Sequence, residues 1–506
     1  MEDRISLRPD QTIATIAPEL YGHFAEHLGR CVYDGIWVGP ESDVANLDGL
    51  RRETVELLRE LHPPVIRWPG GCFADDYRWE DGVGPRRERP RRRNLWWVQT
   101  PERIPEESNE FGTDEFVRFC REVGAEPYLV LNVGSGTPTE AANWIEYCNY
   151  DGETEYANRR RANGNDEPYG ITYWGFGNEG WGCGGRHDPE SYALACRRFA
   201  NYVKTLDRFL LDEPLEFVAS GHTGEGWNEQ FLETLGDAVE FYDLTGYDLV
   251  DHLAVHRFFE SGPDTAFTNE QYYRLFARAG KVADDIDRAA AAIDRYVPGS
   301  NVGVVVDEWG VWHRNCVAET GLQQENTVRD ALVAAGVLDL FNERADVLTM
   351  ANLAQTVNVL QCVVQTDTET AWPTPTYHVF NLYRAHAGAS AVPISIETDR
   401  RSVENADRDI SMLSASVSIA DERLHVTASN REIDTTRTVR IETGLAVSTA
   451  EARVAFEDLA PDAYSTRENA RSFAPDDHSV DVDRNGTLVV DVPSASVVSI
   501  TAVLSS

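Results

Sequence analysis

The sequence predicts an α/β protein in which a (β/α)8 barrel is followed by an antiparallel β-sandwich. Three observations support this. Strand-like and helix-like segments alternate from Leu20 onward, as βα units around a parallel sheet do. After about residue 390 the helical period gives way to short segments of alternating polarity. Glu179 and Glu308 directly follow buried, β-rich runs, at the strand ends where barrels of this TIM type carry their active sites.

Eight strands separated by helices are expected in the barrel. The candidate strands are short runs rich in β-branched or aromatic residues: Leu20 to Phe24, Val65 to Pro69, Tyr128 to Val133, Ile171 to Asn178, Leu215 to Gly221, Leu253 to Phe259, Val302 to Asp307 and Val347 to Leu353. Apolar residues at three- and four-residue spacing predict the helices Leu50 to Leu61, Thr113 to Val123, Pro189 to Leu210, Asn269 to Tyr296 and Asn326 to Leu340.

The C-terminal part is predicted to form a jelly-roll-like β-sandwich. Its candidate strands are Leu413 to Ile419, Arg423 to Ser429, Thr435 to Ile441, Thr487 to Val492 and Val497 to Leu504, and Asn485-Gly486 is a hairpin turn signal. We expect residues 1–19 to add a strand to this sandwich, residues 20–389 to form the barrel and residues 390–506 to form the sandwich. No linker rich in Pro, Gly or Ser separates the parts, so rigid packing is expected.

Composition and the N-terminus suggest a soluble protein of the cytoplasm. Apolar residues make up 42% of the chain, and no uninterrupted apolar stretch has the length of a membrane span. The N-terminus lacks a basic region followed by an apolar segment, which argues against secretion. No membrane partner is expected.

The eight cysteines are scattered without a CxxC pair, so neither a zinc site nor a disulfide framework is indicated and reduced thiols are expected. Cys183 and His187, four residues apart, are too sparse a pair to predict a metal site. No metal and no cofactor are expected.

The chain is strongly acidic. It carries 84 acidic and 46 basic residues, a net charge of −38, and Lys204 and Lys281 are its only lysines. Such a surface suits an environment in which salt screens self-repulsion, so we interpret it as a halophilic adaptation. Nucleic acid is an improbable partner, because phosphate binding needs a basic footprint. The one basic cluster, Arg86 to Arg93, is short and interrupted, which favours ion pairing within a loop or a subunit contact over RNA binding.

Two carboxylates at strand ends match the needs of glycosidic bond hydrolysis. One carboxylic acid must protonate the leaving oxygen, and one carboxylate must stand near the anomeric carbon. An arbitrary glutamate is usually a surface charge. Glu179 and Glu308, however, each follow a buried strand, have a polar neighbour before them, and precede Gly180 or Trp309, which suggests a rim beside aromatic surface suited to sugar stacking.

Several stretches in order resemble glycoside hydrolase family 51, the retaining α-L-arabinofuranosidases. They are Gly22 to Gly29, Arg67 to Phe73, Trp79 to Pro85, Glu110 to Asp114, Asn132 to Gly136, Gly177 to Glu179, Val255 to Phe258, Asp307 to Trp312 and Leu353 to Val359. The resemblance spans most of the barrel.

The resemblance implies roles for individual residues. Glu179 matches the acid/base and Glu308 the nucleophile of the family. Other positions match residues that hold the furanose, with Asn178 bonding the sugar 2-OH: Glu26, Asn178, His256 and Gln355. Trp97 and Trp312 match aromatic walls on the aglycone side, although large aromatics also dominate cores.

Two positions depart from the pattern of the simplest bacterial members. Cys72 stands where an Asn commonly faces the sugar, and Phe258 stands where a Tyr often follows the His-Arg pair. Cys72 is expected to form a pocket wall or to be a small buried hydrophobe. Both changes remove hydrogen-bonding capacity, so they bear on sugar specificity more than on reaction type.

The favoured interpretation is an exo-acting α-L-arabinofuranosidase on arabino- or arabinoxylo-oligosaccharides, and the resemblance implies a homo-oligomer, commonly a hexamer. A β-xylosidase or endo-glucanase on the same scaffold is the alternative within the enzyme class, because loops decide whether the pocket is closed. A non-catalytic carbohydrate-binding protein is opposed by the presence of both glutamates. A metal-dependent hydrolase has little support without clustered histidine ligands.

Overall fold

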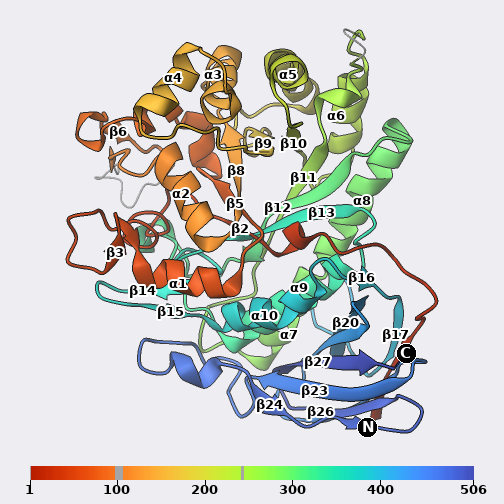
Figure 1. The fold of residues 1–506 in the computed structure, drawn as a ribbon. Coiled ribbons are helices and arrows are strands. Elements are labelled where there is room, and N and C mark those ends of the chain that lie inside the picture. The colour runs from red at the N-terminus through yellow and green to blue at the C-terminus, as the bar shows by residue number, and fades with distance from the viewer. Residues whose placement is uncertain (1, 97–105, 241–243, 506) are drawn as a thin grey trace.

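The computed structural model describes residues 2–96, 106–240 and 244–505. Eight parallel strands close into a barrel in chain order: β2 (Gly22–Phe24), β5 (Val65–Trp68), β8 (Glu126–Leu131), β9 (Tyr173–Phe176), β10 (Glu216–Ser220), β11 (His252–Phe259), β12 (Gly303–Val311) and β13 (Leu348–Ala354). Helices surround it, and the C-terminal sheets lie below it in Figure 1. The predicted fold class is confirmed.

The barrel strands bury both faces. Alternate residues such as Val65, Val130, Val305 and Met350 form a small buried cluster of their own. The intervening residues, such as Ile66, belong instead to the larger core beneath the helices. Because side chains alternate along a strand, the first set fills the barrel interior and the second packs against the helical layer. This two-sided burial explains why the strands appear in the sequence as nearly continuous apolar runs.

The helices that cover the barrel are α1 (Arg52–Leu61), α2 (Thr113–Val123), α3 (Pro138–Asn149), α4 (Glu155–Ala162), α5 (Pro189–Leu210), α6 (Trp227–Gly236), α7 (Asn269–Ala279), α8 (Lys281–Tyr296), α9 (Val328–Asn342) and α10 (Pro375–Tyr383). The single helix predicted over Asn269 to Tyr296 was wrong, because the chain forms α7 and α8 on either side of Gly280. Arg408 donates to the carbonyl of Gly280 at 2.7 Å, which gives that group a partner outside the helix.

Two larger sheets make up the C-terminal part together with β1. One has the order β17 (Ile394–Glu397), β1 (Glu2–Leu7), β22 (Arg437–Glu442), β26 (Leu488–Val492) and β25 (Asp481–Val482). The other has the order β16 (Ser390–Ala391), β20 (Leu413–Ala420), β21 (Arg423–Asn430), β27 (Ser496–Leu504), β23 (Val447–Ala455) and β24 (Asp476–His478). Their inward side chains share one apolar core, and β1 lies between β17 and β22.

Short strands pair within the loops as two-stranded sheets: β3 (Asn46–Leu47) with β4 (Leu50–Arg51), β6 (Arg92–Arg93) with β7 (Glu106–Glu107), β14 (Val364–Thr366) with β15 (Ala371–Pro373), and β18 (Arg400–Arg401) with β19 (Ile410–Ser411). In the described part of the chain, no helix combines the length and apolarity needed to cross a membrane.

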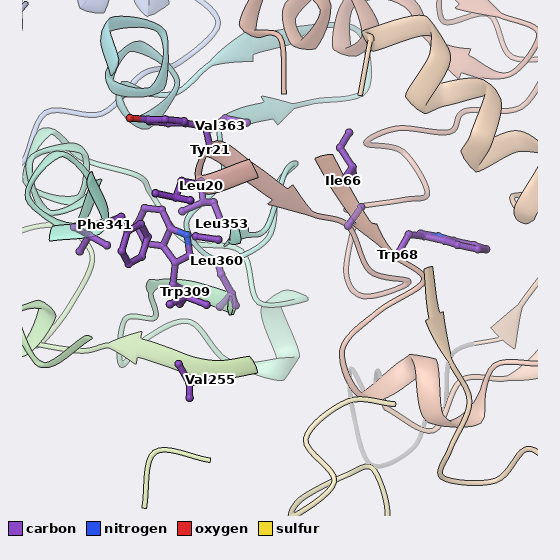
Figure 2. Packing of buried hydrophobic residues seen from close by; sticks show 14 of the residues in the cluster. Leu20, Tyr21, Ile66, Trp68, Val255, Trp309, Phe341, Leu353, Leu360 and Val363 are labelled. Atoms are coloured by element: carbon purple, nitrogen blue, oxygen red, sulfur yellow. The ribbon is translucent and has the colours of Figure 1, made fainter. Parts of the chain in front are cut away.

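Trp309 shows how β12 is anchored to the helical layer. Its ring is fully buried, 5.3 Å from the ring of Phe341 on α9. Figure 2 shows it beside Leu353 and Leu360. The expectation of aromatic surface for sugar stacking beside Glu308 was therefore wrong for this residue, because Trp309 points away from the pocket into the core.

Candidate active site

A β-bulge in β12 directs two successive acidic side chains into the barrel. Along β11, Val255 pairs with Val306 and His256 with Glu308, so Asp307 is an extra residue without a partner. A bulge of this kind re-aims the side chains that follow it. Asp307 and Glu308 both bond to groups within the barrel, whereas Trp309 turns outward. The strand predicted to end at Asp307 continues to Val311, so Glu308 lies within β12 and not after it.

Glu179 and Glu308 face each other across His256. The imidazole Nδ1 lies 3.1 Å from Oε1 of Glu179 and 3.7 Å from Oε2 of Glu308. One oxygen of each carboxylate and one nitrogen of the histidine all lie within 4.8 Å of one another. The side chain of Glu179 is 22% exposed and that of Glu308 is 8% exposed, so Glu179 is the more accessible to a leaving group.

Arg67 is a central residue of the site that sequence reasoning did not identify. Its guanidinium is buried and donates to Oε1 of Glu308 at 2.8 Å and to Oδ1 of Asn178 at 2.7 Å. It also pairs with Oδ2 of Asp307 at 3.0 Å. A charged residue inside the apolar run of β5 was the available signal, because a buried arginine requires acidic partners.

Asp307 is itself held on both sides. The hydroxyl of Tyr128 donates to Oδ2 at 3.0 Å, and the amide of Asn352 donates to Oδ1 at 3.0 Å. Asp307, Arg67 and Glu308 therefore form a continuous buried network that fixes the orientation of the Glu308 carboxylate.

The environment gives the ionisable groups different proton affinities. Burial raises the pKa of Glu308, against the opposing charges of His256 and Arg67. Burial also acts to raise the pKa of Glu179, but the hydrogen bond from His256 and the charges of His256 and Arg67 outweigh it and bring the pKa below its usual value. For His256, burial alone would lower the pKa, yet the two carboxylates outweigh it and raise the pKa. The opposite directions of these two shifts are those expected for a hydrogen-bonded pair of opposite charge, with His256 favouring its protonated form and Glu179 its ionised form.

Glu26 and Gln355 form a second pair beside the carboxylates. The amide of Gln355 donates to Oε2 of Glu26 at 3.0 Å, and the backbone N–H of Phe73 donates to Oε1 at 3.2 Å. Burial, together with the charge of Glu308, raises the pKa of Glu26 to about 8. Glu26 is therefore protonated at neutral pH and able to donate a hydrogen bond.

The structure contradicts the expectation of reduced thiols at two positions. Cys72 and Cys183 form a disulfide across 111 residues of sequence, with their Cα atoms 5.4 Å apart. The spacing gave no sign of it, because the barrel alone brings the two loops together. The amide of Asn178 lies 3.6 Å from Sγ of Cys183, so the disulfide borders the site. Cys183 is thereby removed from any metal site with His187, and the other six cysteines are buried and free.

Two of the predicted aromatic residues meet at the rim. The rings of Phe258 and Trp312 lie 5.4 Å apart, edge to face, and Trp312 is 37% exposed. The indole N–H of Trp312 donates to the carbonyl of Cys316 at 3.0 Å, which fixes the ring. Trp97 lies outside the described residues.

A barrel that presents a close pair of carboxylates, one within β12 and one just after β9, backed by a buried arginine, has the arrangement of a glycoside hydrolase. Comparison with known proteins narrows this class. Residues 57–265 match the family model described as alpha-L-arabinofuranosidase 1 domain, and residues 307–496 match alpha-L-arabinofuranosidase C-terminal domain. The chain belongs to the family 51 α-L-arabinofuranosidases.

Individual relatives agree along almost the whole chain. The intracellular exo-alpha-L-arabinofuranosidase of Bacteroides ovatus is 36% identical and is matched over 98% of this chain and 95% of its own. The crystal structure of the GH51 arabinofuranosidase from Xanthomonas axonopodis pv. citri is 34% identical, with a TM-score of 0.91 and 99% of each chain covered. The Thermotoga maritima α-L-arabinofuranosidase, solved as an arabinose complex, is 31% identical, with a TM-score of 0.84 and all of both chains covered.

Proposed function

We propose that this protein is a retaining exo-acting α-L-arabinofuranosidase that releases terminal α-L-arabinofuranosyl residues from arabino- or arabinoxylo-oligosaccharides. The observation that carries the proposal is the carboxylate pair, whose nearest oxygens lie within 4.8 Å of one another. Retaining glycosidases hold their two carboxyl groups about 5–5.5 Å apart, and inverting ones about 6.5–9.5 Å apart. The names of the Bacteroides ovatus and Thermotoga maritima relatives support the choice of sugar.

In the first step, a carboxylate oxygen of Glu308 attacks the anomeric carbon while the bond to the aglycone oxygen breaks. Glu179 delivers a proton to that oxygen, and the aglycone leaves as an alcohol. In the second step, water attacks the anomeric carbon of the glycosyl ester and gives its proton to Glu179, and the ester bond to Glu308 breaks. Arg67 orients Glu308 for the attack, and His256 lies within hydrogen-bonding distance of Glu179.

The remaining site residues are proposed to hold the substrate. Asn178 is available to the sugar 2-OH, and Glu26 with Gln355 and His256 to the other furanose oxygens, while the Cys72–Cys183 disulfide and Phe258 line the wall. Trp312, and Trp97 by family resemblance, would contact the aglycone. The interpretation requires no cofactor.

A panel of nitrophenyl glycosides tests the activity. We expect turnover of the α-L-arabinofuranoside with the α-furanose configuration retained in the first-formed product. Preference for the β-xyloside or for an internal glucan linkage would favour the alternative enzymes on this scaffold. Absence of turnover on every substrate, in protein whose fold is intact by circular dichroism, would favour a binding protein.

Glu26 provides a pH prediction for sugar binding. Its pKa of about 8 means that it is protonated below that pH and negatively charged above it. The inhibition constant of L-arabinose should therefore be flat below about pH 7 and rise about tenfold per pH unit above pH 8, as the hydrogen-bond donor is lost. In Glu26→Gln the amide cannot ionise, so its binding should be weaker but independent of pH in this range. A wild-type constant that stays flat to pH 9 would contradict this role.

The source is proposed to be halophilic, the location cytoplasmic and the assembly a homo-oligomer. The net charge of −38 supports a halophilic source, and the name of the intracellular relative supports a cytoplasmic location. The Cys72–Cys183 disulfide opposes a cytoplasmic location, because disulfides are uncommon in the cytosol.

Salt dependence tests the halophilic proposal. Charge repulsion reaches about 30 Å at 0.01 M salt but only about 3 Å at 1 M. Melting temperature and particle mass should therefore both rise with salt concentration. Thermal melts and light scattering across a salt series measure this, and flat values throughout would show that the acidic surface does not stabilise the fold in this way.

A further inference from the structure

Asp75 is a buried carboxylate that connects three strand ends behind the site. It lies on the 3-10 helix Cys72–Asp76, which begins a short turn after β5 ends at Trp68, and is 4% exposed. Oδ1 accepts the backbone N–H groups of Val133 at 3.0 Å and of Gly134 at 2.8 Å, both of which follow β8. Oδ2 accepts the backbone N–H of Asn178 at 2.8 Å, which follows β9. All three bonds join the Asp75 carboxylate to backbone N–H groups, and none of them involves Glu179 or Glu308.

Glycines enclose this carboxylate closely. A Cβ atom on Gly184 would lie 2.7 Å from Oδ2, and one on Gly177 would lie 2.8 Å from Oδ1. One on Gly134 would lie 2.7 Å from the Asp75 Cβ. Any side chain at these glycines would therefore collide with Asp75, and two of them, Gly177 and Gly184, flank the segment that carries Asn178 and Glu179.

That segment has a backbone that needs outside support. Glu179 has a φ of +44°, in the left-handed region that residues with a Cβ rarely adopt. On its C-terminal side the turn is closed by the N–H of Gly182, which donates to the carbonyl of Glu179 at 2.6 Å. On its N-terminal side the segment is held by the bond from the Asn178 N–H to Asp75, beside the bonds from the Gly177 N–H to the Leu131 carbonyl at 3.1 Å and from Arg67 to the Asn178 side chain. A small rotation there would displace the Glu179 carboxyl from the leaving oxygen.

We propose that Asp75 is a positioning residue for the reaction, which by holding the Asn178 N–H places the Glu179 carboxyl for proton transfer to the aglycone. The inference rests on the proposed acid/base role of Glu179. Arg67 bonds both the attacking carboxylate and the Asn178 side chain, whereas the Asp75 carboxylate bonds Asn178 only at its backbone N–H, next to the group that protonates the leaving oxygen. A change at Asp75 should accordingly impair leaving-group protonation and spare nucleophilic attack.

Asp75→Asn tests this, because the amide offers one acceptor oxygen in place of two. With that oxygen facing Val133 and Gly134, the NH2 group faces the Asn178 N–H, donor against donor. On aryl α-L-arabinofuranosides, kcat/KM should change less than about threefold for a dinitrophenyl leaving group and fall about 100-fold for phenyl and for an arabinoxylo-oligosaccharide. A merely structural defect would lower all three equally, and that outcome would overturn the proposal.

Two control variants test whether the effect is specific to Asp75, one at a neighbouring carboxylate and one at a carboxyl buried elsewhere in the protein. Asp76→Asn changes the neighbouring, half-buried carboxylate and should leave the leaving-group dependence unchanged. Asp339→Asn changes another buried carboxyl that accepts bonds from Tyr383, Ser414 and Ser416 near the sandwich; it should lower the melting temperature without altering that dependence. If Asp75→Asn does not fold, Asp75→Glu keeps the charge and lengthens the side chain against the enclosing glycines, and the same selective loss is expected.

The inference and the role on which it rests fail in different ways. If Glu179→Gln shows no dependence on the leaving group, the acid/base assignment is wrong. If the rate loss of Glu179→Gln depends on the leaving group and that of the Asp75 variants does not, only the positioning role is wrong. In the double variant, Asp75→Asn should cost the oligosaccharide less than threefold beyond Glu179→Gln alone, since both changes remove the same proton transfer. Full additivity of the two losses would contradict the proposal.

Discussion

Replacing Glu308 with alanine should abolish turnover of activated and natural substrates alike, by roughly 10⁶-fold, the scale of loss when a covalent nucleophile is removed. No glycosyl-enzyme can form without this carboxylate, whatever the leaving group. Arg67 and Asp307 would remain in place, but they have no group to present to the anomeric carbon. Rates on a nitrophenyl arabinofuranoside and on an oligosaccharide measure the effect.

Added azide provides a chemical check on this variant. In the space left by the Glu308 side chain it can attack the anomeric carbon directly, giving a glycosyl azide of inverted configuration. Glu319→Ala, at an exposed glutamate on the loop after β12, is the matched control and should retain wild-type activity. Wild-type rates in Glu308→Ala would show that the nucleophile lies elsewhere.

The barrel could be predicted from the sequence because its strands carry a local signal. Each is buried on both faces, so β-branched and aromatic residues accumulate in short runs such as Val302 to Asp307. The ends of the strands could not be predicted as well as their existence, because hydrogen bonding and not hydrophobicity decides where a strand ends. β23 was not predicted at all: much of one face is exposed and carries Glu451 and Arg453, which weakens the apolar pattern.

The site residues likewise include some that the local sequence predicts and others that only the folded structure reveals. Glu179 follows β9 and Glu308 lies within β12, and both could be found locally because each comes after a recognisable apolar run. Arg67 could have been found only by asking what neutralises a charge inside an apolar run. The Cys72–Cys183 bond and the contact of Asp75 with Asn178 join segments more than 100 residues apart, and neither has a signature in its own neighbourhood. The bulge at Asp307 depends on pairing with β11, so its effect on Glu308 required the folded barrel.

Glu179→Ala should give a different pattern from Glu308→Ala, because proton donation matters in proportion to how poor the leaving group is. A dinitrophenolate departs unaided, so attack by Glu308 should remain fast and the slow step should become hydrolysis of the glycosyl-enzyme, which also needs Glu179 as a base. A sugar alkoxide cannot depart unprotonated, so turnover of an arabinoxylo-oligosaccharide should fall by about 10²- to 10⁴-fold.

Azide again distinguishes the roles in Glu179→Ala. Because it needs no base, it should accelerate breakdown of the glycosyl-enzyme and yield a glycosyl azide of retained configuration, the opposite stereochemistry from that expected in Glu308→Ala. The two variants together therefore assign each carboxylate by the configuration of one product, independently of the size of either rate loss. Equal losses on dinitrophenyl and oligosaccharide substrates, or an azide product of inverted configuration, would show that Glu179 is not the group that protonates the aglycone.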